Sequence, residues 1–161
     1  MQAIDGTLLN KISLLLKKQK LKIATAESCT GGLIAHTLTN VSGASNYFDR
    51  GVISYSNKSK SELLGIPEKL IEKYGAVSNP VAKAMAEGVR VKSDVDIGIA
   101  TTGIAGPTGG TKEKPVGLVF IAISTKGNVV VKKFQFSGNR IQNKYDTCTA
   151  ALEMLYDVLK R

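Results

Sequence analysis

The chain has 161 residues, of which 43% are hydrophobic and 22% charged, and it carries a formal net charge of +9. This length suits one globular domain over residues 1–161, and the composition is ordinary for a soluble globular protein. No apolar run approaches the length of a membrane helix, and residues 1–6 lack the basic-then-apolar pattern of a signal peptide. We therefore expect a cytoplasmic protein with no membrane partner.

The basic residues favour an anionic partner: a phosphorylated small molecule, nucleic acid or a membrane surface. They are dispersed along the chain, however, and aromatic residues do not alternate with them as in proteins that bind single strands. We interpret most of the charge as solvated surface and expect no nucleic-acid partner. Cys29 and Cys148 are too few and too far apart in sequence to form a disulfide framework.

Hydrophobic spacing predicts the elements of the first half in chain order. They are a helix at 4–19, a strand at 21–25, a helix at 33–38, a strand at 50–55, short helices at 57–65 and 68–74, and a helix from Pro80 to about Lys92. Asn57 is the predicted N-cap of the helix at 57–65, and Gly65 is its predicted stop.

The second half is predicted to be richer in strands. It comprises a buried strand at 95–101, a glycine-rich loop at 103–110, strands at 116–124 and 129–136 joined by a hairpin turn, and a helix at 140–159. Helices between strands imply parallel pairing, whereas the hairpin makes one strand antiparallel. The prediction is an α/β fold with helices on both faces of a mixed five-stranded sheet. The strand at 129–136 looks unprotected, which favours a homo-oligomer.

The turn at residues 25–32 is the point where the first strand passes directly into a helix. Its side chains supply hydroxyls, a thiol and a carboxylate, and it ends in two glycines. Ligands of α/β proteins bind beyond the carboxyl ends of strands, where a following helix offers free N–H groups to anions. The alternative is that Ser28 or Thr30 only caps the helix while the glycines relax a tight turn.

Several kinds of chemistry fit the sequence poorly. His36 is the only histidine and no cysteines are paired at ligand spacing, so we expect neither a metal nor another cofactor. Cys29 and His36 are seven residues apart on one helix, about 10 Å, which is too far for direct proton transfer. The glycine-rich loop lacks the Gly-Lys-Ser/Thr sequence of a phosphate-binding P-loop.

The chemistry that still fits the sequence is a serine nucleophile with a lysine as its base. A lysine can take this role because burial allows it to lose its proton. Lys60 follows the second predicted strand much as Ser28 follows the first, and parallel strands would bring both to one edge of the sheet. The sequence does not distinguish Lys60 from Lys58, and an ordinary lysine at either position would be exposed.

The motifs together resemble the CinA C-terminal domain family, which includes the nicotinamide-nucleotide amidases (NMN deamidases). The likeness covers nearly the whole chain and rests on residues 25–32, Tyr55-Ser56-Asn57 with Lys60, 64–65, 75–78, 102–107, 114–117 and 138–140. It implies a three-layer α/β/α sandwich with a mixed five-stranded sheet, with Ser28 as nucleophile and Lys60 as base. The large N-terminal domain of full-length CinA has no counterpart here, and Lys144 stands where the family often has a second arginine.

The resemblance implies an amidohydrolase of pyridine nucleotide recycling, which converts nicotinamide mononucleotide (NMN) and water to nicotinic acid mononucleotide and ammonia. Tyr55 is expected either to orient Lys60 or simply to pack at the strand end. Arg140 is expected to bind the substrate phosphate, or alternatively to form an ion pair with Glu27. Backbone N–H groups of the Thr30–Gly32 turn or the Gly103–Gly106 loop would stabilise the oxyanion. The full set of expected substrate-binding residues is Thr30, Gly31, Gly32, Thr102, Gly103, Gly106 and Arg140.

The competing hypothesis is a non-catalytic module that binds a nucleotide or nucleic acid and is linked to competence and DNA uptake. The basic composition favours it, whereas the combination of serine, lysine and glycine-rich turns favours an enzyme.

Overall fold

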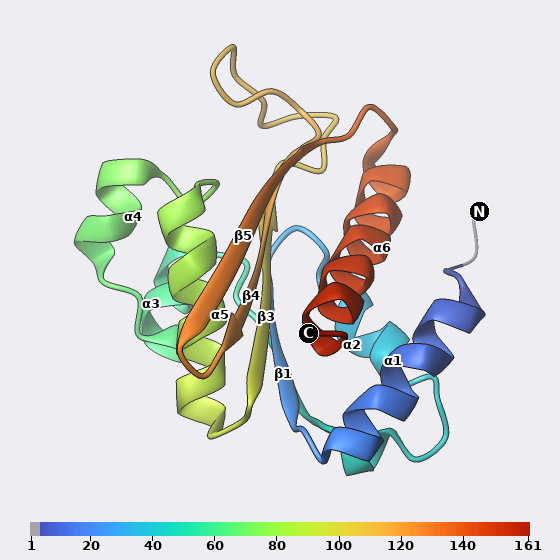
Figure 1. The fold of residues 1–161 in the computed structure, drawn as a ribbon. Coiled ribbons are helices and arrows are strands. Elements are labelled where there is room, and N and C mark those ends of the chain that lie inside the picture. The colour runs from blue at the N-terminus through green and yellow to red at the C-terminus, as the bar shows by residue number, and fades with distance from the viewer. Residues whose placement is uncertain (1–3) are drawn as a thin grey trace.

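The computed structural model describes residues 4–161 as a mixed sheet between two layers of helices (Figure 1). Residues 1–3, which begin the segment considered above as a signal peptide, lie outside the described residues. Within residues 4–161, no helix combines the length and the apolar character needed to cross a membrane.

The elements follow the predicted order, with one added 3₁₀ turn. They are α1 (Gly6–Gln19), β1 (Ile23–Glu27), α2 (Leu33–Leu38), η1 (Ala44–Asn46), β2 (Phe48–Ile53), α3 (Asn57–Leu64), α4 (Glu68–Tyr74), α5 (Asn79–Ser93), β3 (Ile97–Gly103), β4 (Leu118–Thr125), β5 (Asn128–Gln135) and α6 (Arg140–Leu159).

The strands lie in the order β2-β1-β3-β4-β5. β1 pairs in parallel with β2 and β3, whereas β4 is antiparallel to both β3 and β5. The prediction of a mixed five-stranded sheet with one antiparallel strand is therefore confirmed. Glu27, the last residue of β1, is paired with Ile53 of β2 and Thr101 of β3. The register thus brings the ends of three strands to one edge of the sheet.

Two hydrophobic clusters fill the spaces between the layers. Helices α1, α2 and α6 cover one face of the sheet, and α3, α4 and α5 cover the other (Figure 1). Isoleucines of the strands pack toward α6, whereas small residues such as Ala100 pack toward α5. At Gly98 a β-carbon would lie 2.1 Å from the Ala86 carbonyl oxygen, so α5 can approach the sheet closely only over glycine and alanine.

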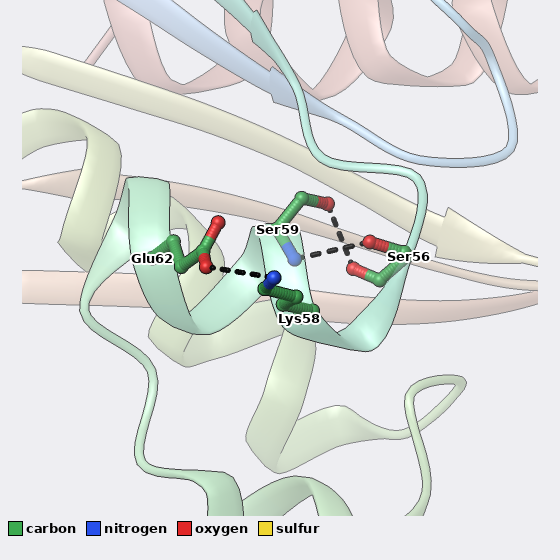
Figure 2. Close-up of polar contacts among 4 residues, drawn as sticks. All are labelled: Ser56, Lys58, Ser59 and Glu62. Atoms are coloured by element: carbon green, nitrogen blue, oxygen red, sulfur yellow. Dashed lines mark hydrogen bonds and ion pairs between the residues drawn. The ribbon is translucent and has the colours of Figure 1, made fainter.

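The start of α3 differs from the prediction by one residue. Ser56, rather than Asn57, is the N-cap: its hydroxyl accepts the Ser59 N–H at 3.1 Å, and the Ser59 hydroxyl donates to the Ser56 carbonyl at 2.8 Å (Figure 2). The predicted stop at Gly65 is confirmed, because this residue adopts the left-handed conformation that glycine tolerates best. The cap fixes the start of the helix that carries Lys60.

Candidate active site

Ser28 occupies the first position beyond β1 and is held by its backbone. Its N–H donates to the Thr101 carbonyl of β3 at 3.0 Å, and its own carbonyl accepts the Gly31 N–H at 3.1 Å. The turn then requires positive φ at Gly31 (+62°) and Gly32 (+100°), a conformation that explains the paired glycines. Ser28 keeps 8% of its surface exposed, so it lies at the bottom of the turn without being sealed off.

The Glu27 carboxylate fixes the start of α2 beneath this turn. It accepts the N–H groups of Gly32, Ile34 and Ala35 at 2.8–3.1 Å. It also accepts the Thr30 hydroxyl at 2.6 Å, and that hydroxyl lies 2.8 Å from the Thr101 hydroxyl. A buried carboxylate thus satisfies N–H groups that a short helix cannot satisfy itself. The expected Glu27–Arg140 ion pair is not formed.

Lys60 extends from the buried side of α3 to the nucleophile. Its Nζ lies 3.2 Å from Ser28 Oγ, 2.9 Å from the Ser54 carbonyl oxygen and 3.2 Å from the Tyr55 carbonyl oxygen. Only 1% of the residue is exposed. A neutral amine has two N–H donors and one lone pair, so it can donate to both carbonyls while accepting the proton of the serine hydroxyl.

Burial lowers the pKa of Lys60 below its ordinary value, because a charged ammonium is poorly solvated there. A negative charge on Cys29 would oppose this shift. Burial, however, raises the pKa of the Cys29 thiol to about 12, so the thiol is protonated at neutral pH. The three ion pairs found among residues 4–161 all involve other lysines and arginines. The environment therefore favours the neutral amine that a general base requires.

Lys58, the alternative base, points away from the sheet. Its side chain is 82% exposed and its Nζ lies 3.5 Å from a Glu62 carboxylate oxygen one helical turn later (Figure 2). The structure therefore resolves the ambiguity left by the sequence in favour of Lys60. His36, the only histidine in the sequence, is exposed.

Tyr55 contacts Lys60 in a way that the sequence did not predict. Only its backbone carbonyl contacts the amine; its side chain is turned outward, and the residue is 59% exposed. The Tyr55 hydroxyl instead accepts a hydrogen bond from Arg140 Nη2 at 3.0 Å, and Arg140 Nη1 donates to the Gly106 carbonyl at 2.8 Å. The expectation that the tyrosine side chain orients Lys60 is thus corrected: this side chain helps to fix Arg140.

The other expected substrate-binding residues have structural contacts. The Thr102 hydroxyl donates to the Ala76 carbonyl at 2.9 Å. A β-carbon at Gly103 would lie 2.7 Å from the Leu118 carbonyl oxygen, and one at Gly106 would lie 2.4 Å from a Val116 methyl group. Gly103 thus lets the end of β3 lie close to the start of β4, and Gly106 lets the two ends of the 104–117 loop lie close together. Any contact they make with a substrate would therefore be through the backbone.

Within the Thr30–Gly32 turn, two of the predicted oxyanion donors are already used. The Gly31 N–H donates to the Ser28 carbonyl and the Gly32 N–H to the Glu27 carboxylate. No hydrogen bond among the described residues uses the Thr30 N–H, so this group is the remaining donor of the turn.

A cavity of about 430 Å³ borders Arg140 between the 104–117 loop and the start of α6, a volume within the usual range for small-molecule sites. Its lining residues are Ala105, Pro107, Val116, Gly138, Asn139, Arg140 and Ile141. A separate cavity of about 290 Å³ lies between α3 and α4, and neither of the two cavities is lined by Ser28 or Lys60. Over residues 4–161, no group of three or more acidic, histidine or cysteine side chains is placed to hold a metal ion.

Sequence reasoning missed the roles of Glu27 and Asn143. Asn143 is buried and links two segments: its Nδ2 donates to the Ala105 carbonyl at 3.0 Å, and its Oδ1 accepts the Gly138 N–H at 2.9 Å. An acidic residue ahead of a helix is a recognisable signal for Glu27. An asparagine in the first turn of α6 carries no comparable signal, because its burial depends on how the distant 104–117 loop folds.

The fold and the buried Ser28–Lys60 pair define a three-layer α/β/α protein with a polar site at the carboxyl edge of its sheet. A family model of the CinA C-terminal domain matches residues 5–159, and the chain belongs to this family. Relatives include a competence-damage inducible protein of Caldicellulosiruptor bescii, 52% identical over 153 residues, and a CinA-like protein of Syntrophus aciditrophicus, 51% identical over 152. Each alignment covers 94% of this chain but only 37% and 36% of those longer proteins.

Solved structures agree with this assignment over the whole domain. A competence/damage inducible protein from Agrobacterium tumefaciens is 38% identical, with a TM-score of 0.92 and 100% coverage of both chains. A competence or damage-inducible protein from Enterobacter asburiae is 30% identical, with a TM-score of 0.93 and 99% coverage of both. The family resemblance and the fold predicted from the sequence are therefore confirmed.

Proposed function

We propose that this domain is an amidohydrolase that converts NMN and water to nicotinic acid mononucleotide and ammonia, in pyridine nucleotide recycling. The observation that carries the proposal is the placement of the Lys60 amine, buried and 3.2 Å from Ser28 Oγ. The other two contacts of the amine are with backbone carbonyl oxygens, and a neutral amine has the two N–H groups needed to donate to both. Ser–Lys pairs are an established variant of the hydrolase arrangement.

In the first half of the reaction, Ser28 Oγ attacks the carboxamide carbon as Lys60 takes the hydroxyl proton. The negative charge that develops on the carboxamide oxygen needs a donor, and the free Thr30 N–H is the candidate within the turn. The carbon–nitrogen bond then breaks. Lys60 gives its proton to the departing nitrogen, which leaves as ammonia and yields an ester on Ser28.

In the second half, Lys60 takes a proton from water, and the resulting hydroxide attacks the ester carbonyl. Collapse of this intermediate breaks the bond to Ser28 Oγ, which recovers the proton from Lys60. The net change is one amide and one water converted to one carboxylic acid and one ammonia. No metal or organic cofactor enters the balance.

The direct test is release of ammonia from NMN by the purified chain, with formation of nicotinic acid mononucleotide followed in the same samples. Wild-type protein should release the two products in equal amounts, and Ser28→Ala should release neither while unfolding at the same temperature. Turnover by Ser28→Ala would reject the covalent mechanism, and no turnover by the wild type would reject the activity.

The second candidate is a non-catalytic module that binds a nucleotide or nucleic acid. The net charge of +9 and the competence-related names of the relatives support it. It predicts nucleic-acid binding by both wild type and Ser28→Ala without ammonia release. The same pair of proteins therefore separates the two functions.

A further inference from the structure

A polar cavity of about 450 Å³ lies between α5 and the β4–β5 hairpin, and the proposed reaction does not use it. The hairpin is at the opposite edge of the sheet from the candidate active site (Figure 1). Ser124 of β4 pairs with Gly98 near the start of β3, whereas Ser28 contacts Thr101 near the end of that strand. The polar residues that line this second cavity are Lys83, Glu87, Arg90, Thr125 and Asn128.

Arg90 is fixed by one edge of its guanidinium group, and the rest of the group is unpaired. Its Nε donates to Ser124 Oγ at 2.9 Å, and Ser124 is completely buried. The other four N–H groups of the guanidinium have no hydrogen bond or ion pair among residues 4–161. Because Arg90 is partly buried, leaving these donors unpaired costs stability. The free edge is therefore held ready for a planar anion such as a carboxylate.

Two further charges of α5 line the same cavity. Glu87 precedes Arg90 by three residues and follows Lys83 by four, so the three side chains are neighbours on one face of the helix. Residues at these spacings often form ion pairs, yet Glu87 takes part in none of the three ion pairs found in residues 4–161. The cavity is thus lined by two cations with a carboxylate between them along the helix, and none of the three has a partner of opposite charge in the described chain.

We propose that this cavity binds an acidic α-amino acid, a ligand with two carboxylates and one ammonium group. The α-carboxylate binds the free edge of Arg90, the ammonium binds Glu87, and the side-chain carboxylate binds Lys83. The α-carboxylate and the ammonium are attached to the same carbon, which suits two side chains separated by one helical turn. A simple anion such as phosphate would also meet the Glu87 carboxylate, so the mixed charges favour a ligand that carries both signs. This site goes beyond the proposed amidase reaction and does not depend on it.

The test compares binding of L-glutamate and glutarate to the wild type by calorimetry. Glutarate has the same two carboxylates but no ammonium, so it carries the larger negative charge. Unspecific attraction to a protein of net charge +9 therefore favours glutarate. The proposed site predicts the reverse order, with L-glutamate bound about 10-fold or more tightly, as for one charged hydrogen bond. An equal or higher affinity for glutarate, or no binding of L-glutamate at millimolar concentration, would overturn the inference.

Variants then locate the binding. Arg90→Gln should weaken L-glutamate binding about 10-fold or more. Arg50→Gln is the matched control and should stay within about twofold, because Arg50 is exposed on the edge strand β2 and pairs with Asp49. Equal affinities of these two variants would contradict the assignment to Arg90.

Glu87→Gln keeps the test decisive if Arg90→Gln is unstable without its bond to Ser124. Glu87 takes part in no ion pair within residues 4–161, so this variant loses none. It removes the partner of the ammonium group and should abolish the preference for L-glutamate over glutarate. A preference that persists in Glu87→Gln would show that the ligand does not bind at this cavity.

Discussion

The floor and the rim of the site are built in opposite ways. The floor, comprising Glu27, Ser28 and Lys60, is almost completely buried. Hydrogen bonds to the backbone hold both the Glu27 carboxylate and the Lys60 amine in place. The rim, comprising Tyr55, Arg140 and Lys144, is more exposed and keeps unused hydrogen-bond donors. Buried, satisfied groups hold a geometry, whereas exposed donors are available to a ligand. Changes to the floor should therefore affect chemistry and folding, and changes to the rim should affect binding.

The largest difference is expected between two lysines of the same helix. Lys60→Met removes the proposed base and should lower kcat on NMN by about 10²- to 10⁴-fold. Lys58→Met removes the same charge from the exposed side of α3, along with a weak ion pair to Glu62, and should leave kcat within twofold. Initial rates of ammonia release measure both. Comparable decreases in kcat for the two variants would contradict the assignment of the base to Lys60 on the buried face of α3.

A change to the capping carboxylate should act on stability. Glu27→Ala leaves the N–H groups of Gly32, Ile34 and Ala35 without their acceptor, and we expect a loss of roughly 2–4 kcal/mol in the free energy of unfolding. Urea unfolding measures this loss. Asp5→Ala is the matched control, because Asp5 caps α1 at an exposed position by accepting the Thr7 N–H at 2.8 Å. A loss no larger than that of the control would show that the buried cap is not needed.

At the rim, Arg140→Ala should raise KM for NMN by about 10- to 100-fold, as expected for loss of a charged hydrogen bond to phosphate. KM for the unphosphorylated nicotinamide riboside should change far less. Tyr55→Phe keeps the guanidinium but removes one of its two protein acceptors, so its effect should be smaller. Equal increases in KM for the nucleotide and the riboside would assign Arg140 a structural role.

The smallest effect concerns stability as a function of pH. An unfolded lysine keeps its proton up to a pKa of about 10.4, whereas burial lowers the pKa of folded Lys60. Between these values the unfolded chain binds more protons, so the free energy of unfolding rises with pH by at most about 1.4 kcal/mol per unit. The wild type should therefore gain stability relative to Lys60→Met as the pH rises toward about 10.4. Parallel urea-unfolding curves for the two proteins would show that burial does not perturb Lys60.

The sequence predicts the fold well because local patterns determine it. The helix at 140–159 is found with its predicted bounds, since Asn139 caps it and its apolar face is long. The sequence also allowed Ser28 and Lys60 to be predicted as neighbours, because parallel strands bring their carboxyl ends to one edge of the sheet. The partners of Tyr55 and Asn143 were not, since each depends on a segment distant in the chain. Arg140 lies 85 residues from Tyr55, and no local pattern specifies that contact.

Ammonia release from NMN by Lys60→Arg, measured beside the wild type, tests the central claim most directly. Arginine keeps a positive charge at position 60 but does not release its proton in proteins, so it cannot act as a general base. A proton-accepting role for Lys60 predicts rapid release by the wild type and almost none by Lys60→Arg, with the variant still folded by circular dichroism. Substantial release by Lys60→Arg would show that position 60 contributes only charge and would contradict the Ser28–Lys60 mechanism.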